Sequence, residues 1–136
     1  MKQLKERHVV VLVDDEPEVL SALRRALRKE PHPVLATSRP AEALRWVEAI
    51  DVSAVVSDHR MPGMTGTELA EDFARLLGHA VPTVMLTGDP ANAEVPWLAD
   101  APVWVARKPL HAATLLAALP PLVAFRRAVA ASAAPR

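Results

Sequence analysis

Residues 9–17 read VVVLVDDEP, an apolar run that ends in three acidic residues and a proline. Four valines and a leucine in close succession favour a strand that is buried on both faces, as in a parallel sheet. Pro17 then opens a segment with apolar residues at helical spacing as far as Lys29. A buried strand followed directly by an amphipathic helix is the first part of a β-α-β unit, so the acidic residues lie at the carboxyl end of a strand.

The alternation of apolar runs and helical segments continues along the chain. Further strands are expected at residues 34–36, 54–57, 83–86 and 103–106, and further helices at 40–49, from Thr65 onward, from Asp89 onward and at 111–119. Five such strand-helix units predict an α/β fold with a doubly wound, five-stranded parallel sheet. In such folds the functional site lies at the carboxyl ends of the strands.

The starts of three helices carry local signals. Thr65 followed by Glu68 has the form of a capping box, which predicts a helix start at that point. Ser38 is a candidate cap for the helix at residues 40–49. Asp89 before a proline predicts the start of the fourth helix, which Pro96 must end or kink after about two turns.

Length and composition limit the domain organisation. A chain of 136 residues with 51% hydrophobic content is long enough for one buried core and too short for two ordinary domains. We therefore expect one domain over residues 1–119. Pro120 and Pro121 interrupt the fifth helical segment, and residues 120–136 are interpreted as a helical extension or linker.

Charge and residue types exclude several classes of function. The 16 basic and 16 acidic residues cancel, which gives no general attraction to nucleic acid or to an anionic membrane. The lack of cysteine excludes disulfides, thiol nucleophiles and thiolate metal sites. The longest apolar stretch, residues 112–125, contains two prolines and is too short to span a bilayer, and residues 1–7 lack the apolar core of a signal peptide. We expect a cytoplasmic protein without membrane contact.

Reactive side chains follow four of the five expected strands. They are Asp14, Asp15 and Glu16 after the first, Asp58 after the third, Thr87 after the fourth and Lys108 after the fifth. These positions converge at one edge of a parallel sheet. Carboxylates within about 4 Å of one another repel by roughly 1 kcal/mol per pair in water and more in a protein, so the cluster calls for a cation. Oxygen ligands without cysteine or clustered histidine favour Mg²⁺.

A carboxylate beside Mg²⁺ can also act as a nucleophile toward phosphorus and form an acyl phosphate. The ammonium of Lys108 and the hydroxyl of Thr87 are candidates for neutralising the transferring group, and Gly88 leaves room for phosphate to approach. Taken alone, Asp14 and Asp15 are more readily explained as a helix cap than as a metal site. Their combination with the other strand-end residues favours a metal and phosphate site.

Four motifs occur in order at these strand ends: VLVDDEP at residues 11–17, SDHRMPGMTG at 57–66, LTG at 86–88 and KP at 108–109. Together they resemble the receiver domain of two-component response regulators, over residues 8–119. The resemblance implies a flavodoxin-like, CheY-like sheet with strand order 2-1-3-4-5. It also implies a phosphorelay switch that is not an enzyme, apart from its own phosphorylation and dephosphorylation at Asp58.

The resemblance assigns a role to the acidic positions. Asp58 is implied as the phosphoacceptor, which takes phosphate from a sensor histidine kinase or a histidine phosphotransfer protein. Asp15, Asp58 and the backbone carbonyl of Arg60 are implied as direct ligands of Mg²⁺. Asp14 is implied to act through a water molecule on the same ion.

The resemblance also implies how the signal leaves the site. Lys108 and Thr87 would bind the phosphoryl oxygens, and Thr87 would move on phosphorylation. Three residues before the lysine, where the family usually has an aromatic, this chain has Val105, and Trp104 points to the opposite face. We expect output, including a homodimer, through the surface of the fourth helix, fifth strand and fifth helix without the usual aromatic rotation. Direct contact with nucleic acid is not expected.

Two other functions share parts of this pattern. A pseudo-receiver keeps the fold as an interaction module without phosphorylation, but such proteins typically lose the phosphoacceptor, an acidic residue or the lysine, all of which are present here. A haloacid dehalogenase phosphatase needs Asp-x-Asp after its first strand, whereas Asp14 is followed two residues on by Glu16, and the chain has no room for a cap domain. The histidines, including His59, show no ligand spacing and are interpreted as surface residues.

Overall fold

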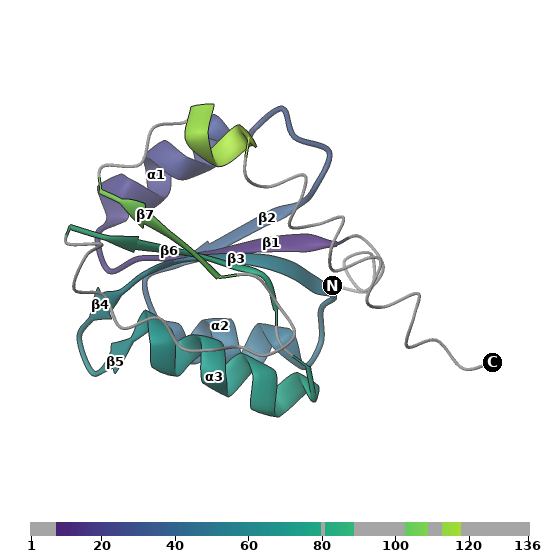
Figure 1. The fold of residues 1–136 in the computed structure, drawn as a ribbon. Coiled ribbons are helices and arrows are strands. Elements are labelled where there is room, and N and C mark those ends of the chain that lie inside the picture. Colours follow the sequence, from purple (N-terminus) through teal and green to yellow (C-terminus); the bar gives the residue numbers. More distant parts are fainter. Residues whose placement is uncertain (1–7, 80, 89–102, 109–112, 118–136) are drawn as a thin grey trace.

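The computed structural model describes residues 8–79, 81–88, 103–108 and 113–117 (Figure 1). Its main sheet is parallel and contains β1 (Val9–Val13), β2 (Val34–Thr37), β3 (Val52–Asp58), β6 (Thr83–Thr87) and β7 (Val103–Arg107). The strand order is β2-β1-β3-β6-β7. This is the predicted order 2-1-3-4-5, because β4 (Arg60–Met61) and β5 (Met64–Thr65) form a separate antiparallel hairpin after β3.

The three central strands, β1, β3 and β6, are buried along their whole length. Alternate residues of β1 enter the two layers of the core. Val10 and Leu12 pack on one side of the sheet, and Val9, Val11 and Val13 pack on the other. Both faces of β1 therefore need apolar side chains, which is why its sequence shows no alternation of polar and apolar residues.

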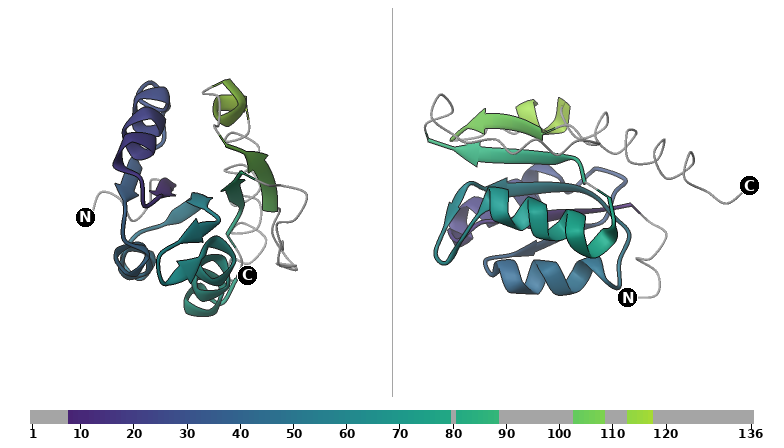
Figure 2. Two further views of the ribbon diagram at one scale, coloured as in Figure 1. Left: turned by 90° about the vertical axis from the view of Figure 1, so that its left-hand side faces the viewer. Right: turned by 60° about the horizontal axis from the view of Figure 1, so that its bottom comes forward.

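Helices cover both faces of the sheet (Figures 1 and 2). α1 (Pro17–Ala26) and the helical residues 113–117 lie on one face, where Leu23, Leu27 and Leu115 are buried. α2 (Pro40–Val47) and α3 (Gly66–Leu77) lie on the other face and bury a cluster that includes Phe73. The predicted doubly wound α/β fold is confirmed.

The observed helix ends agree with the predicted cap at Thr65 but differ from the predictions for α1 and α2. Thr65 and Glu68 form the predicted capping box: Thr65 Oγ1 accepts from the Glu68 N–H at 3.1 Å, and Glu68 Oε1 accepts from the Thr65 N–H at 3.2 Å. The prediction of Ser38 as the cap of α2 is wrong. Arg39 occupies that position without a side-chain cap, and its own N–H is bound by Thr37 Oγ1 at 3.0 Å. α1 ends at Ala26, three residues before the predicted end.

Several predicted elements fall outside the described residues. They are the fourth helix from Asp89, the two ends of the fifth helix at residues 111–112 and 118–119, and the extension at residues 120–136. Among the helices that are described, none is both long enough and apolar enough to cross a membrane.

Candidate functional site

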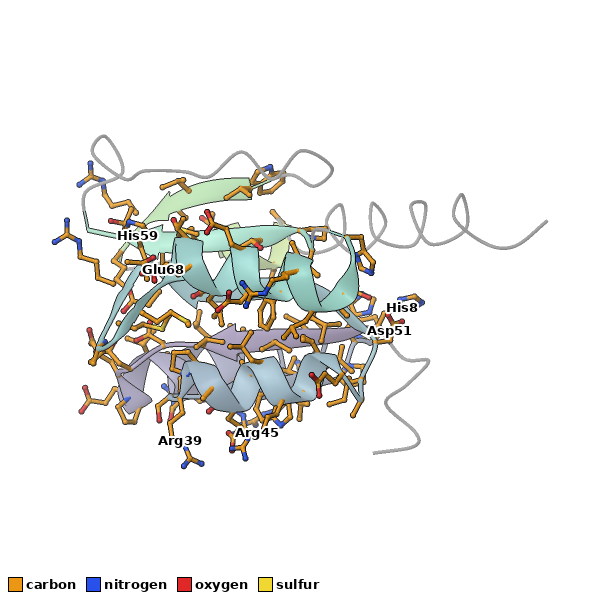
Figure 3. All side chains as sticks on the ribbon, turned by 90° about the horizontal axis from the view of Figure 1, so that it is seen from below. His8, Arg39, Arg45, Asp51, His59 and Glu68 are labelled. Carbon is orange, nitrogen blue, oxygen red and sulfur yellow. The ribbon has the colours of Figure 1, made fainter. Side chains whose placement is uncertain are left out.

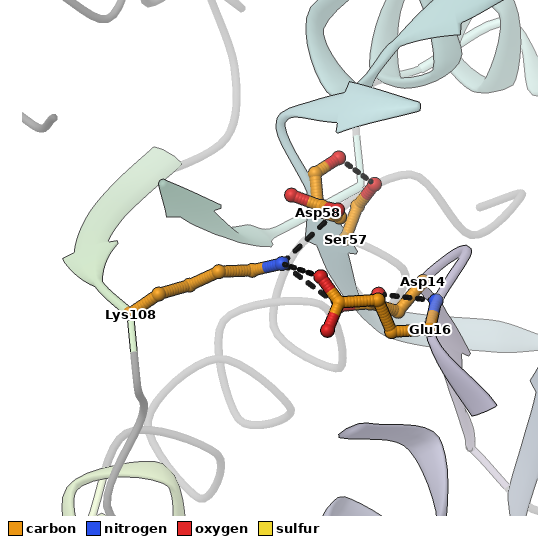
Figure 4. Close-up of polar contacts among 5 residues, drawn as sticks. All are labelled: Asp14, Glu16, Ser57, Asp58 and Lys108. Carbon is orange, nitrogen blue, oxygen red and sulfur yellow. Dashed lines mark hydrogen bonds and ion pairs between the residues drawn. The ribbon is translucent and has the colours of Figure 1, made fainter. Parts of the chain in front are cut away.

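Four predicted site residues lie at the carboxyl ends of the strands, and Figure 4 shows Asp14, Asp58 and Lys108 close together there. Asp14 directly follows β1, Asp58 is the last residue of β3, Thr87 is the last residue of β6 and Lys108 directly follows β7. The register of β3 and β6 places Asp58 opposite Leu86, one residue before Thr87. The parallel sheet thus brings together at one edge residues that are far apart in the chain, such as Asp14 and Lys108, which are separated by 94 positions.

Lys108 is the centre of the polar contacts. Its Nζ lies 3.0 Å from Asp58 Oδ2, 3.3 Å from Asp14 Oδ2 and 3.9 Å from Glu16 Oε1 (Figure 4). Its backbone N–H donates to the carbonyl of Thr87 at 2.9 Å, which joins the end of β7 to the end of β6. One ammonium therefore partly neutralises three carboxylates from two different strand ends.

Burial shifts the titration of these groups. Asp14 is 1% exposed and Asp58 is 6% exposed. Burial raises the pKa of Asp14, and the Glu16 N–H and Lys108 only partly oppose this. Burial also raises the pKa of Asp58; Lys108 opposes the shift, and the neighbouring carboxylates of Asp14 and Asp15 add to it. Burial lowers the pKa of Lys108, but its acidic partners outweigh this effect, so the net shift is upward.

One oxygen of Asp14 is incompletely satisfied. Oδ1 accepts from the Glu16 N–H at 2.9 Å, whereas Oδ2 is buried and has no hydrogen bond within the described part of the chain. The 3.3 Å approach of Lys108 Nζ is an ion pair without hydrogen-bond geometry. A buried carboxylate oxygen in this state needs a further positive partner.

The surrounding acidic residues suit a hard divalent cation. Carboxylate oxygens of Asp14, Asp15 and Glu16 lie within 4.8 Å of one another. With the orphaned Oδ2 of Asp14 and no sulfur ligand, this donor set fits Mg²⁺. Arg60, whose carbonyl was the remaining predicted ligand, is exposed at the start of β4. Glu16 joins the cluster, although the resemblance gave it no role.

The loop after Asp58 is closed tightly against the end of β3. Ser57 Oγ donates to the carbonyl of Asp58 at 2.9 Å, and the N–H of Gly66 donates to the carbonyl of His59 at 2.7 Å. A Cβ on Gly66 would lie 2.7 Å from the Asp58 carbonyl oxygen. Glycine is therefore required at residue 66 by a close backbone approach. The β4-β5 hairpin between them turns at Gly63, whose φ is +79°.

Residues 10–119 match the sequence model of the response regulator receiver domain. The chain belongs to this family. It is a receiver domain of the kind found in response regulators of two-component systems.

Relatives of this receiver domain are longer proteins. It is 35% identical over 82 residues to the cyclic di-GMP phosphodiesterase response regulator RpfG of Xanthomonas campestris, covering 57% of this chain and 21% of that protein. It is 30% identical over 132 residues to the phosphoglycerate transport system transcriptional regulatory protein PgtA of Salmonella typhimurium, covering 94% of this chain and 31% of that protein. The chain thus spans less than a third of either relative.

A solved structure supports the fold of this receiver domain. The CheY-like response regulator receiver domain protein of Methanospirillum hungatei superimposes with a TM-score of 0.73 at 24% identity. The match covers 92% of this chain and 98% of that one. At this identity the likeness concerns the fold, and it agrees with the flavodoxin-like order of the sheet.

The surroundings of two histidines of this receiver domain differ from those predicted. His59, predicted to face solvent, is half-buried, and its Nδ1 lies 3.0 Å from Met85 Sδ. His8 is half-buried too, with Nδ1 2.9 Å from Ser53 Oγ and 3.3 Å from Asp51 Oδ2, at the opposite end of the sheet (Figure 3). Both contacts join residues far apart in sequence, so no local pattern announces them.

A Cβ at Gly88 would meet no atom within 4 Å, so the fold itself does not require glycine there. The expectation that Gly88 leaves room for phosphate stays a prediction.

Proposed function

We propose that this receiver domain is a Mg²⁺-dependent phosphorylation switch in which Asp58 accepts a phosphoryl group. The donor would be the phosphohistidine of a sensor histidine kinase or of a histidine phosphotransfer protein. The observation that carries the proposal is the contact of a nearly buried Asp58 with Lys108 at 3.0 Å, beside the carboxylates of Asp14 and Asp15.

The transfer is a substitution at phosphorus. An oxygen of the Asp58 carboxylate forms a bond to phosphorus while the bond between phosphorus and the donor imidazole nitrogen breaks, and the electron pair stays on the imidazole. The product is an acyl phosphate. Asp58 must be ionised to attack, so the Lys108 ammonium, which favours the carboxylate form, offsets part of the pKa increase that burial causes.

The other residues position and neutralise the phosphoryl group. Lys108 already lies within ion-pair distance of Asp58, and its ammonium would bind a phosphoryl oxygen. The hydroxyl of Thr87, at the end of the neighbouring strand, would bind a second oxygen. Bound Mg²⁺ would supply additional neutralisation of the phosphoryl charge. Asp15, Asp58 and the carbonyl of Arg60 would hold the ion, with Asp14 acting through a water molecule.

The domain would act as a switch rather than as an enzyme on other substrates, because its chemistry is limited to gain and loss of phosphate at Asp58. Output would leave through the surface that contains β7, where Trp104 is 43% exposed, and would include homodimerisation there. Val105, in the place of the usual aromatic, is half-buried on the same strand. The domain itself would make no nucleic-acid contact.

Intact-mass spectrometry tests the phosphoacceptor directly. Treatment with acetyl phosphate and Mg²⁺ should add one phosphoryl group, and EDTA or Asp58→Asn should prevent the gain. Asp72→Asn is the matched control, because Asp72 lies in α3 and pairs with Arg75 away from the site. An unchanged mass of the wild-type protein under excess donor and Mg²⁺ would contradict the proposal and favour the pseudo-receiver.

A further inference from the structure

His59, the residue after Asp58, is tied to β6 by two contacts. Its backbone N–H donates to the carbonyl of Leu86 at 2.8 Å. Its ring Nδ1 lies 3.0 Å from Met85 Sδ. A thioether sulfur can only accept a hydrogen bond, so Nδ1 carries the hydrogen in this contact. The residue next to the phosphoacceptor therefore binds both the backbone and a side chain of the neighbouring strand.

Met85 collects contacts from two sides of the site. Its side chain is fully buried, at 0% exposure. Besides His59, it accepts from Thr67 Oγ1 at 3.8 Å, and Thr67 lies in the first turn of α3. The sulfur thus links the phosphoacceptor loop and the start of α3 to β6. Met is unbranched and flexible, so it can change rotamer without a large strain.

The position of Met85 in the sheet connects this contact to β7. Met85 and Thr87 are two residues apart on β6, so their side chains share one face of the sheet. Val105 is the register partner of Met85 on β7 and lies on that same face. Its neighbour in sequence, Trp104, is exposed. A row of side chains therefore runs from His59 through Met85 to Val105, on the strand that carries the exposed Trp104.

We propose that His59 is a positioning residue that couples the phosphoryl state of Asp58 to β7 through Met85. The inference rests on the proposed function, since it requires occupancy of Asp58. A displacement of the loop at residues 58–59, or of Thr87 on β6, acts on both partners of the His59–Met85 contact. The Met85 side chain transmits the displacement to Val105, where a small side chain takes the place of a large one.

The experiment follows Trp104 fluorescence in a Trp46→Phe/Trp97→Phe background on addition of beryllofluoride, a phosphoryl mimic, with Mg²⁺. The ¹⁹F NMR signal of bound beryllofluoride measures the occupancy of Asp58 independently. His59→Phe keeps a ring but removes the donor, and His59→Asn keeps an N–H near the place of Nδ1. With beryllofluoride bound, the equilibrium constant for the change reported by Trp104 should fall about two- to tenfold in His59→Phe, as expected for the loss of one hydrogen bond. It should recover in His59→Asn.

Met85→Leu breaks the same contact from the β6 side and keeps the side-chain volume, so it should reproduce the loss seen in His59→Phe. An unchanged Trp104 response in His59→Phe or in Met85→Leu, with beryllofluoride bound, overturns the coupling role. A wild-type protein that binds beryllofluoride without any Trp104 response overturns it too. If the wild-type protein binds no beryllofluoride, the proposed function itself is contradicted, which separates the two failures.

Discussion

The ammonium of Lys108 lies 3.0 Å from Oδ2 of Asp58 and joins the residue after an edge strand to the last residue of a central one. This contact holds together a site whose other members are acidic. Without it, the buried carboxylates of Asp58 and Asp14 would face each other with no cation among the described side chains within ion-pair distance of either. The stability of the metal-free protein should therefore depend on Lys108.

Replacement of Lys108 tests this dependence. Lys108→Ala should lower the free energy of unfolding in EDTA at pH 7 by about 1.5–3 kcal/mol, the usual contribution of a hydrogen bond to a charged group. Urea denaturation measures the change. Lys29→Ala is the control, because Lys29 is exposed and removal of its charge should have little effect. Equal stability of the two variants would show that the ion pairs of Lys108 contribute nothing to the fold.

The pH dependence of stability should reveal the buried carboxyl groups. Burial raises the folded-state pKa of Asp14 and of Asp58 above the ordinary value of 3.8. The folded state then binds more protons than the unfolded state, so the two groups stabilise the protein below pH 3.8 and this contribution is lost as pH rises through their folded pKa values. The raised pKa of Lys108 acts in another range, because its contribution is lost only above pH 10.5.

Asp14→Asn isolates one of these carboxyl groups. In EDTA, its free energy of unfolding relative to wild type should increase as pH rises above 3.8, because the variant no longer ionises a buried carboxyl whose Oδ2 lacks a hydrogen bond. Urea denaturation at a series of pH values gives the difference curve. A flat curve would mean that burial does not disfavour the charged form of Asp14.

Addition of Mg²⁺ should make the wild-type protein more stable than Asp14→Asn, the opposite of the order expected in EDTA. Under the proposed function Mg²⁺ would bind the folded site, so the free energy of unfolding should rise with the Mg²⁺ concentration, by about 2.7 kcal/mol at 100 times the dissociation constant. Asp14→Asn and Asp58→Asn should both weaken this gain, whereas Asp72→Asn should retain it. Chemical denaturation with Mg²⁺ and with EDTA measures the effect. A gain of the same size in all variants would place the ion elsewhere on the protein.

Two glycines near the site provide a matched pair. Gly66→Ala would put its Cβ 2.7 Å from the Asp58 carbonyl oxygen, a backbone atom, and should cost about 1–3 kcal/mol of stability and slow phosphorylation. Gly88→Ala meets no atom within 4 Å and should change stability by less than about 0.5 kcal/mol. Urea denaturation and the rate of mass gain with acetyl phosphate measure both effects. Similar behaviour of the two variants would contradict the close-approach argument.

The fold was largely predictable because each main strand contains a short apolar run. The ends of the strands were less so. β3 was predicted at residues 54–57 but spans Val52–Asp58, since its buried polar residues Ser53 and Asp58 look like loop residues in the sequence. The β4-β5 hairpin was missed, because strands of two residues are too short to show any periodicity.

The site was predictable to the extent that it follows from topology. Asp14, Asp58, Thr87 and Lys108 were identified because each stands at a strand end, and parallel strands bring those ends together. The contact between His59 and Met85 has no such rule. It spans 26 positions and depends on which way a ring turns after the strand has ended, which only the packed structure determines.

The strands that carry the site differ in how firmly the core holds them. Asp14, Asp58 and Thr87 end or follow strands that are buried throughout, whereas Lys108 follows β7, whose five residues are all half-buried or exposed. Mutations in β1, β3 or β6 would disturb the packing of the hydrophobic core. Mutations at the exposed positions of β7 would move the Lys108 ammonium with less effect on that packing. Under the proposed function, substitutions in β7 would therefore let evolution tune the lifetime of the phosphorylated state while the fold stays intact.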